Sequence, residues 1–228
     1  DAHLMKVLGE QLIASEKVGV LELIKNAYDA GASFCKVKIE QIPNLPALAE
    51  SGKLFEDVGG PIITIEDDGK GMDKDTIENG WLRPASTMKS NIKEIMKRER
   101  KKAIEENKLG AYDSLIASLK NEHGGRLPLG EKGVGRFATH RLGKKMELIT
   151  KTKDIDYEYV LKIEWDKFDT LETTQHIDLD SIGISLTRRN PTRDYGLKGS
   201  GTKIIISGGR DGYEWDKEKI IDINKMIK

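Results

Sequence analysis

The first part of the chain carries apolar residues at helical spacing. Between Lys6 and Tyr28 they recur every three or four positions, at Leu8, Leu12, Ile13, Val20, Leu23, Ile24 and Ala27. This period predicts an amphipathic helix, or two helices broken near Gly19. The segment AGAS that follows supplies Gly31, and glycine commonly ends helices.

Strands are predicted where apolar and polar residues alternate. CKVKIE, residues 35–40, alternates in this way, and IITIEDDGKGM, residues 62–72, predicts a strand that runs into an acidic turn rich in glycine. The prolines and glycines of residues 43–61 predict a loop between these strands. Four later runs also have strand character: residues 145–152, 157–165, 183–189 and 201–208.

Helices come first and strands are grouped behind them, with a last helix expected in residues 213–228. This order predicts the α+β class, as a two-layer α/β sandwich with helices on one face of a mixed, mostly antiparallel sheet. It argues against a regularly alternating parallel sheet. At 228 residues the chain is long enough for one substantial core, so we expect a single domain over residues 1–228.

Residues 89–126 differ from the rest because they are heavily charged and biased toward lysine and glutamate. The segment is expected to be helical in parts and ends near a Gly-Gly pair. It predicts a solvated helical excursion from the core, as an insertion over residues 89–129.

The charges of the whole chain cancel, with 38 basic and 38 acidic residues. Net charge therefore does not indicate nucleic acid or an anionic membrane as the main partner, although it is compatible with a local basic patch. The sequence has no apolar run of the roughly 20 residues that span a bilayer and no signal-peptide pattern. We expect a soluble, cytoplasmic protein with no membrane partner. The single cysteine, Cys35, excludes an internal disulfide, argues against a thiolate metal site and is predicted to be buried in a strand.

A carboxylate and a carboxamide interrupt the apolar pattern of the first helix. Glu22 and Asn26 are four residues apart, so they project from the same face. In a poorly hydrated setting the carboxylate could orient and deprotonate a water molecule, and the amide oxygen could be a ligand for Mg²⁺. The alternative is an exposed polar stripe that includes Lys25 and Asp29.

The acidic turn after the second predicted strand is the next candidate. Asp67 ends the strand, and a carboxylate there suits a donor such as the exocyclic amine of a purine. Gly69 and Gly71 would let the backbone pass close to a flat ligand, and Met72 offers an adaptable apolar surface for a ring. The alternatives are an ordinary turn or a calcium site, but the dense oxygen ligands of a 12-residue calcium loop are missing.

The third candidate is the glycine loop GEKGVGRFA, residues 130–138. Its glycines can present N–H groups and a helix N-terminus to phosphate, and Lys132 and Arg136 add positive charge. The spacing G-x-G-x-x-A, with Asp154 further along, also approximates a dinucleotide fingerprint. That motif requires a hydrophobic strand immediately before it, and HGGRLPL is not one.

The fourth candidate, GLKGSGTK at residues 196–203, nearly matches a P-loop. That motif ends in Gly-Lys-Ser/Thr and opens a helix, whereas here Thr202 precedes Lys203 and a strand follows. We therefore expect Thr202 to lie at the start of a strand and to donate to a ligand or to Asp67.

Taken in order, these four blocks resemble the GHKL superfamily of ATPases, which includes gyrase, the ninety-kilodalton heat-shock chaperones, histidine kinases and MutL. The resemblance extends from about Lys6 to Ser207, nearly the whole chain. It implies the Bergerat fold, with ATP bound between the helical layer and a flexible lid, and it implies that residues 89–129 form this lid region.

The resemblance also implies roles for individual residues. Glu22 falls on the family's general base and Asn26 on its magnesium ligand. Asp67 falls on the carboxylate that binds the adenine amino group, with Gly71 and Met72 lining the base pocket.

The phosphate side follows in the same way. The phosphate-binding lid loop corresponds to Gly130, Gly133, Val134 and Gly135. Thr202 falls on the threonine that supports the adenine-binding aspartate. The sequence does not assign which basic residue meets the γ-phosphate: Lys89, Lys132 or Arg136.

Some details favour particular branches of the superfamily. The spacing Glu-x-x-x-Asn, the loop GEKGVGRF and the segment WLRPASTMKS look more like the chaperone, MutL and Microrchidia side than the histidine kinases. A histidine kinase would also need a phosphoacceptor histidine on a preceding helix. None of the four histidines lies in such a pattern: His3, His123, His140 and His176.

The expected function is ATP and ADP binding with slow Mg²⁺-dependent hydrolysis, coupled to lid closure and a nucleotide-dependent homodimer. The chain is expected to be the N-terminal part of a larger protein, in which a transducer or effector domain follows and supplies a further basic residue. Hydrolysis by this part alone should be weak. Two alternatives stay open: a nucleotide-sensing interaction module without useful catalysis, and the catalytic domain of a histidine kinase. The biological process is set by residues outside this sequence.

Overall fold

The computed structural model describes residue 13 and residues 15–42, 60–82, 88–122, 125–127, 138–169, 183–210 and 217–227. Helices and strands follow in the order α2 (Glu16–Asp29), β1 (Cys35–Ile42), β2 (Gly60–Asp67), η3 (Thr76–Trp81), α3 (Met88–Glu105), α4 (Leu109–Glu122), α5 (Ala138–Leu142), β3 (Lys145–Lys151), β4 (Glu158–Glu164), α6 (Trp165–Asp169), β5 (Ile184–Arg189), β6 (Gly201–Ser207) and α7 (Lys217–Ile227).

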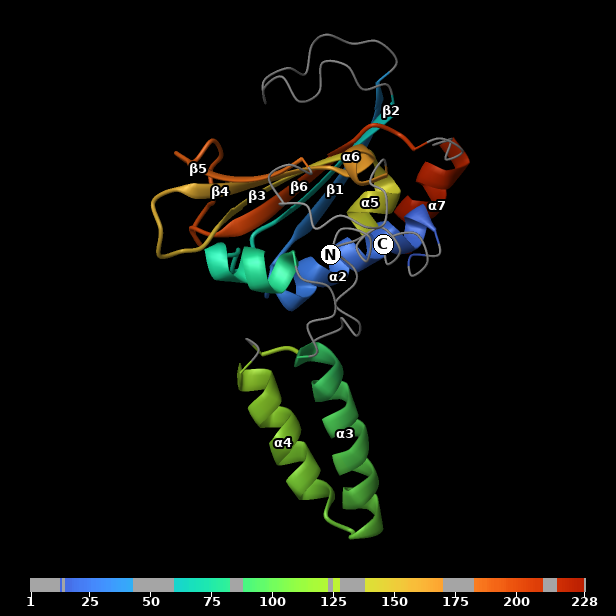
Figure 1. The fold of residues 1–228 in the computed structure, drawn as a ribbon. Coiled ribbons are helices and arrows are strands. Elements are labelled where there is room, and N and C mark those ends of the chain that lie inside the picture. The colour runs from blue at the N-terminus through green and yellow to red at the C-terminus, as the bar shows by residue number, and fades with distance from the viewer. Residues whose placement is uncertain are drawn as a thin grey trace, which may run out of the picture.

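The six strands form one sheet in the order β1-β2-β6-β3-β4-β5. Its five pairings are all antiparallel, which confirms the mostly antiparallel sheet, and no described pairing is parallel. Figure 1 shows α2 and α5 beneath one face of this sheet, which we call the inner face. The opposite face is the outer face. The predicted α+β sandwich is therefore present.

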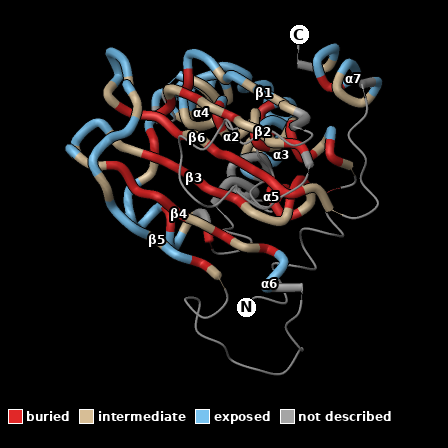
Figure 2. Tube along the Cα trace, turned by 90° about the horizontal axis from the view of Figure 1, so that it is seen from above, coloured by how far each residue is buried: buried red, intermediate tan, exposed pale blue. Residues whose placement is uncertain are grey.

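Strand alternation builds the core on the inner face. Inward residues of the four central strands join Val20 and Leu23 of α2 in one cluster, namely Ile63, Ile65, Met146, Leu148, Leu161, Ile163, Ile204 and Ile206. Figure 2 shows these buried positions running along β6, β3 and β4. A smaller apolar group of Ile149, Val160 and Ile205 lies on the outer face.

Helix α2 is continuous through Gly19. Ser15 caps it by accepting a hydrogen bond from the backbone N–H of Val18. A Cβ atom at Gly19 would lie 3.3 Å from Cγ of Leu142, so the glycine lets α5 pack tightly against α2. No break therefore lies at Gly19 itself, and the glycine has a packing reason; the helix begins at Glu16, after its cap Ser15. The predicted stretch from Lys6 to Leu12 lies outside the described residues.

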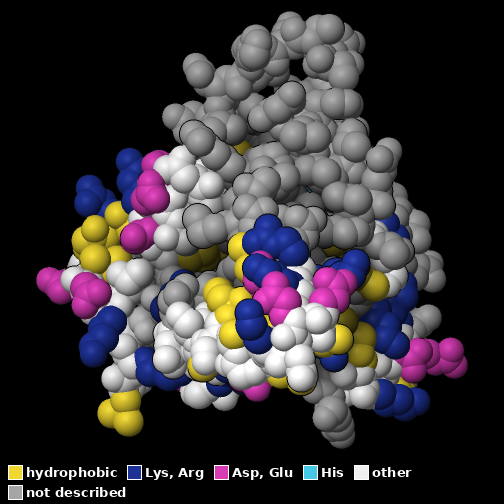
Figure 3. Space-filling view, turned by 90° about the horizontal axis from the view of Figure 1, so that it is seen from below, with side chains coloured by type: hydrophobic (Ala, Val, Ile, Leu, Met, Phe, Trp, Pro, Cys, Tyr) yellow, Lys and Arg dark blue, Asp and Glu magenta, His cyan; other side chains and the backbone are white. Residues whose placement is uncertain are grey.

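The charged segment contains an antiparallel pair of helices, α3 and α4, which projects away from the sandwich (Figure 1). Its helical character was predicted. Viewed from below, the surface of the molecule carries Lys and Arg side chains interspersed with Asp and Glu side chains (Figure 3). No described helix is long and apolar enough to cross a bilayer.

Two short elements were not predicted. η3 is a π-helix whose start is fixed by Asp73, because its carboxylate accepts the backbone N–H of Thr76 at 2.8 Å. α6 continues directly from β4 and buries Trp165, which was assigned to the strand. Neither element has the length at which a hydrophobic period becomes visible in a sequence.

Candidate functional site

Helix α2 carries Glu22 and Asn26 one turn apart, and both residues are half-buried. The Glu22 side chain is 24% exposed, and Nζ of Lys25 donates to its Oε1 at 2.7 Å. The structure therefore combines features of both alternatives, a partly buried carboxylate and a polar neighbour. Any reaction at Glu22 has to be considered together with the ammonium group of Lys25.

Asp67 lies at the end of β2 on the inner face and is 7% exposed. Its Oδ1 accepts the backbone N–H of Gly69 at 2.8 Å. In the sheet it stands between Cys35 of β1 and Thr202 of β6. Burial raises the pKa of the Asp67 carboxyl to about 6, against the lowering effects of the Gly69 N–H, the Arg193 charge and the Thr202 N–H. Asp67 is a buried acceptor whose protonation changes near neutral pH.

The neighbouring Asp68 has a different task. Its carboxylate accepts the backbone N–H groups of Ser33 and Phe34 at 2.6 and 3.2 Å, and also the Ser33 hydroxyl. Nζ of Lys198 pairs with it at 3.0 Å. Burial acts to raise the pKa of Asp68, but these hydrogen bonds outweigh it and hold the pKa well below its usual range. Asp68 therefore ties the acidic turn to the connection between α2 and β1.

The two glycines of the turn allow close approach within the protein. A Cβ atom at Gly69 would lie 2.7 Å from Cβ of Ala30 at the end of α2. Gly71 has a φ of +68°, and a Cβ atom there would lie 2.0 Å from the carbonyl oxygen of Lys151. The described contacts thus explain these glycines by packing of the turn against α2 and β3, while their predicted contact with a flat ligand stays a prediction.

Met72 and Thr202 meet at a residue that the sequence analysis missed. The hydroxyl of Thr150 on β3 accepts the Met72 N–H at 2.9 Å and lies 3.1 Å from the hydroxyl of Thr202. We expected the Thr202 hydroxyl to donate to a ligand or to Asp67, whereas its described partner is Thr150. The Thr202 contribution to Asp67 comes from the backbone N–H. A polar residue at an inward position of KMELITKT was the available signal.

Cys35 is half-buried at the start of β1, where full burial was expected. Burial and, to a smaller extent, the nearby Asp67 carboxylate together raise the pKa of its thiol to about 11. The thiol therefore stays neutral beside Asp67.

Most of the predicted phosphate side lies outside the described residues. This holds for Gly130, Lys132, Gly133, Val134, Gly135 and Arg136. Lys89 is in the first turn of α3, where only the backbone is described. The predicted short helix after the loop is α5. At the end of the charged segment, Nη1 of Arg126 donates to the carbonyl oxygen of Ala32 at 2.9 Å.

A groove of about 750 Å³ runs beside the acidic turn. Of the predicted site residues, Gly69 and Gly71 line it. Ala30, Lys153 and Lys198 contribute further walls, so the groove joins the end of α2, the turn between β3 and β4 and the segment before β6.

A metal ion held by protein side chains alone needs several ligands close together. The described residues contain no cluster of three or more His, Cys, Asp or Glu side chains able to hold a metal. Mg²⁺ is usually bound through one or two protein oxygens together with phosphates and water. The single amide oxygen of Asn26 fits that mode of binding, in which the protein supplies few of the ligands. The described residues do not form a site built from protein ligands alone.

The comparisons with known proteins add the family. The sequence profile described as Histidine kinase-, DNA gyrase B-, and HSP90-like ATPase matches residues 14–202, which is most of the chain. No curated protein matches the chain significantly. The matched range contains α2 with Glu22 and Asn26 and ends at Thr202. With its antiparallel sheet, inner helical layer and buried Asp67, the chain belongs to the histidine kinase-, DNA gyrase B- and HSP90-like ATPases.

Proposed function

We propose that the chain binds ATP and hydrolyses it slowly with Mg²⁺. One observation carries this proposal: a buried carboxylate, Asp67, ends an inner strand and is joined through its own turn to the helix that bears Glu22 and Asn26. The joint is direct, since the Lys70 N–H donates to the carbonyl oxygen of Ala30 at 2.9 Å. Ala30 is the C-terminal cap of α2.

On the adenine side, Asp67 is the acceptor for the exocyclic amine of the base. Its position between two strands excludes most of the solvent, which strengthens a hydrogen bond to a charged acceptor. Gly69, Gly71 and Met72 form the wall around the ring. The hydroxyl groups of Thr150 and Thr202 fix that wall, because Thr150 binds the Met72 backbone.

On the phosphate side, Asn26 would hold Mg²⁺ together with phosphate oxygens, and the ion would neutralise charge on the triphosphate. The backbone N–H groups of the loop at Gly130, Gly133, Val134 and Gly135 would bind the phosphates, aided by Lys89, Lys132 or Arg136. Glu22 orients the attacking water and accepts its proton. Before ATP arrives, Nζ of Lys25 donates to Oε1 of Glu22 and restrains the position of this carboxylate.

The cycle we propose couples ATP binding to lid closure and to pairing of two copies, with a downstream domain as the receiver. ATP can drive this change only by binding the closed state more tightly than the open one. We place the chain nearer to the chaperone, MutL and Microrchidia branch than to the histidine kinases. Sedimentation with and without a non-hydrolysable ATP analogue tests pairing, and a monomer under both conditions contradicts it.

The proposed activity is tested by ATP binding and phosphate release with two variants. Asp67→Asn should weaken binding, and Glu22→Ala should abolish release with binding retained. The assignment is refuted if neither variant changes either quantity.

A sensing module without catalysis is the second candidate, favoured by the Lys25 ion pair, which keeps the predicted base occupied. Tight ATP binding without phosphate release from a longer chain would select it. Transfer of radiolabel from ATP to protein would instead select a histidine kinase.

A further inference from the structure

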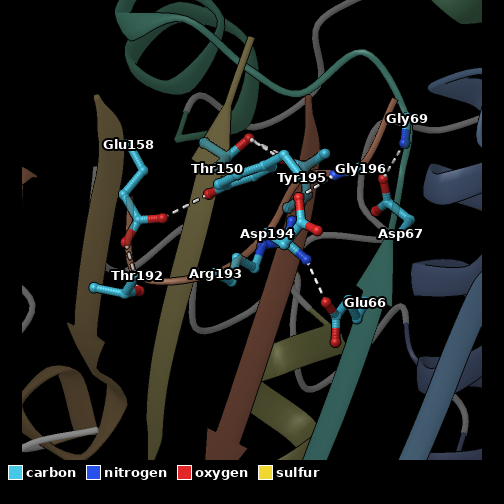
Figure 4. A network of polar contacts seen from close by, with 12 residues as sticks. Glu66, Asp67, Gly69, Thr150, Glu158, Thr192, Arg193, Asp194, Tyr195 and Gly196 are labelled. Carbon is cyan, nitrogen blue, oxygen red and sulfur yellow. Dashed lines mark hydrogen bonds and ion pairs between the residues drawn. The ribbon is translucent and has the colours of Figure 1, made fainter. Parts of the chain in front are cut away.

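The loop between β5 and β6, residues 190–200, has to cross part of the sheet. β5 is an edge strand, whereas β6 lies between β2 and β3. Figure 4 shows the side chains of this loop reaching Glu158 on one side and Glu66 on the other. The loop thus links the far edge of the sheet to the strand that carries Asp67.

One part of the loop is fixed to β4 by a fully buried carboxylate. Glu158 accepts the Thr192 hydroxyl on Oε1 at 2.8 Å and the Tyr195 hydroxyl on Oε2 at 2.7 Å. Nε of Arg189 adds a third bond at 2.6 Å. Burial acts to raise the pKa of Glu158, but the bonds from Tyr195, Arg189 and Thr192 outweigh it and lower the pKa. This carboxylate anchors the loop on the outer face.

The rest of the loop holds the acidic turn on both sides of Asp67. Nη1 of Arg193 pairs with Oε1 of Glu66 at 2.5 Å. Nζ of Lys198 pairs with Asp68 at 3.0 Å. The Ser200 hydroxyl donates to the carbonyl oxygen of Gly69 at 2.9 Å. Three side chains of one loop therefore bind residues 66, 68 and 69 through two ion pairs and one hydrogen bond.

The Arg193 side chain is largely buried although only part of its guanidinium group is hydrogen-bonded. Its side chain is 15% exposed and lies over the Tyr195 ring, with Cζ 4.3 Å from the centroid. Within the described residues, its Nε and Nη2 are buried without a hydrogen-bond acceptor. Burying unpaired guanidinium nitrogens is costly. The packing of the fold alone does not explain why the charge is held there.

Gly201 places this charge beside Asp67. A Cβ atom on Gly201 would lie 3.0 Å from Nη2 of Arg193 and 2.4 Å from the carbonyl oxygen of Asp67. The missing side chain lets the guanidinium lie against the backbone behind Asp67. Any larger residue at this position would separate the two.

The other groups around Asp67 cannot replace that charge. The Cys35 thiol on β1 is neutral, Asp68 in the same turn adds negative charge, and Ala30 of α2 is apolar. Thr202 on β6 contributes only a backbone N–H. Arg193 is the cationic side chain that acts on Asp67 among the described residues.

We propose that residues 190–200 clamp the adenine-binding turn and that Arg193 is its positioning residue, holding β2 from the outer face through Glu66 and placing a positive charge behind Asp67. This inference rests on the proposed role of Asp67 in ATP binding. Arg193 itself acts through Glu66 and the backbone, without touching the nucleotide.

The test compares Arg193→Gln with Arg188→Gln, which removes the same charge from an exposed arginine that stacks on Tyr157. The Asp67 carboxyl is titrated by NMR without nucleotide, and MgATP affinity and turnover are measured separately. In Arg193→Gln the Asp67 midpoint should rise by about 1 pH unit. Affinity at pH 7 should fall about 10-fold, of which the shifted titration of Asp67 accounts for about twofold and the displaced turn for the rest, with turnover at saturating ATP unchanged. Arg188→Gln should match the wild type, and the affinity of Arg193→Lys should lie between those of the wild type and Arg193→Gln.

Each outcome decides the question. A folded Arg193→Gln protein with the wild-type Asp67 midpoint and affinity overturns the inference. If that variant does not fold, Arg193→Lys carries the test: the midpoint should stay within about 0.3 unit while affinity falls about threefold, since the charge remains but its planar stack on Tyr195 is lost. Unchanged affinity in Arg193→Lys then refutes the clamp. A wild type that does not bind ATP refutes the proposed function, and the titration still measures the effect of Arg193 on Asp67.

Discussion

The backbone N–H of Lys70 donates to the carbonyl oxygen of Ala30 at 2.9 Å. This bond joins the acidic turn that follows β2 to the C-terminal cap of α2. The Ala30 N–H in turn donates to the carbonyl oxygen of Asn26. The predicted adenine acceptor and the predicted metal ligand are therefore connected through a short run of backbone, and their spacing is set by the fold.

Replacing Asp67 should separate ligand binding from stability. Asp67→Asn removes a charged acceptor, which we expect to weaken ATP binding about 10- to 100-fold. The buried charge destabilises the folded chain, and an asparagine oxygen can still accept the Gly69 N–H. The melting temperature should therefore rise, equivalent to about 1–2 kcal/mol at pH 7. Calorimetric titration and thermal unfolding measure the two effects, and a loss of both affinity and stability would contradict this account.

The pH dependence of ATP binding follows from the same carboxyl. The folded-state pKa of Asp67 is raised to about 6, so the group takes up a proton as the pH falls through 6. A protonated carboxyl is the poorer acceptor, and we expect affinity to fall on the acid side. Phosphate groups of ATP titrate in the same range, so the ratio of wild-type to Asp67→Asn affinity is the quantity to measure. A ratio that stays constant between pH 5 and 8 would count against Asp67 as the acceptor.

Without nucleotide, the sign for stability is the reverse. The raised pKa of Asp67 means that the folded chain binds a proton more readily than the unfolded chain. Its contribution to stability therefore improves as the pH falls from about 6 toward 4. The difference between wild type and Asp67→Asn in urea unfolding should shrink over this window.

Glu22 should govern turnover more than binding. Glu22→Gln is expected to lower phosphate release about 10²- to 10⁴-fold, the usual range for a lost general base, while ATP affinity changes little. Glu40→Gln is the matched control, because Glu40 also pairs with a lysine, Lys38 at 2.7 Å, but lies on β1 away from α2. Equal turnover of the two variants would remove Glu22 from the proposed mechanism.

Two glycines offer opposite outcomes for the same substitution. Gly71→Ala should destabilise the chain by about 3 kcal/mol or more, since φ is positive and the new Cβ would meet the Lys151 carbonyl oxygen. Gly110→Ala in α4 meets no atom within 4 Å and should stabilise by about 0.5–1 kcal/mol. Urea unfolding measures both. Similar effects at the two positions would show that the turn does not hold Gly71 as described.

Local patterns predicted much of the fold and the adenine side of the site. Alternation located β1, strand-like runs located the other five described strands, and the helical period located α2, because burial on one face leaves a periodic trace in the sequence. Asp67 was singled out because a carboxylate that ends an apolar strand suits an amine donor, and the resemblance to the ATPase superfamily supplied the adenine, a role that stays a prediction.

Contacts between distant segments left no such trace. Arg193 and Glu66 are 127 positions apart, and the sequence around either residue gives no sign that the two pair. Thr150 was overlooked because its partners, Met72 and Thr202, come from two other segments. The continuity of α2 through Gly19 also depends on α5, which the helical period of α2 cannot reveal.

The close contact of Gly19 with α5 couples the positions of α2 and α5. Gly19 lies one turn before Glu22, and α5 follows directly after the predicted phosphate loop. Helix α5 therefore rests on the helix that carries the predicted base, at a separation that the absence of a side chain at Gly19 allows. A displacement of α5 would therefore be passed to the helix of Glu22 by apolar packing alone, without any charged side chain.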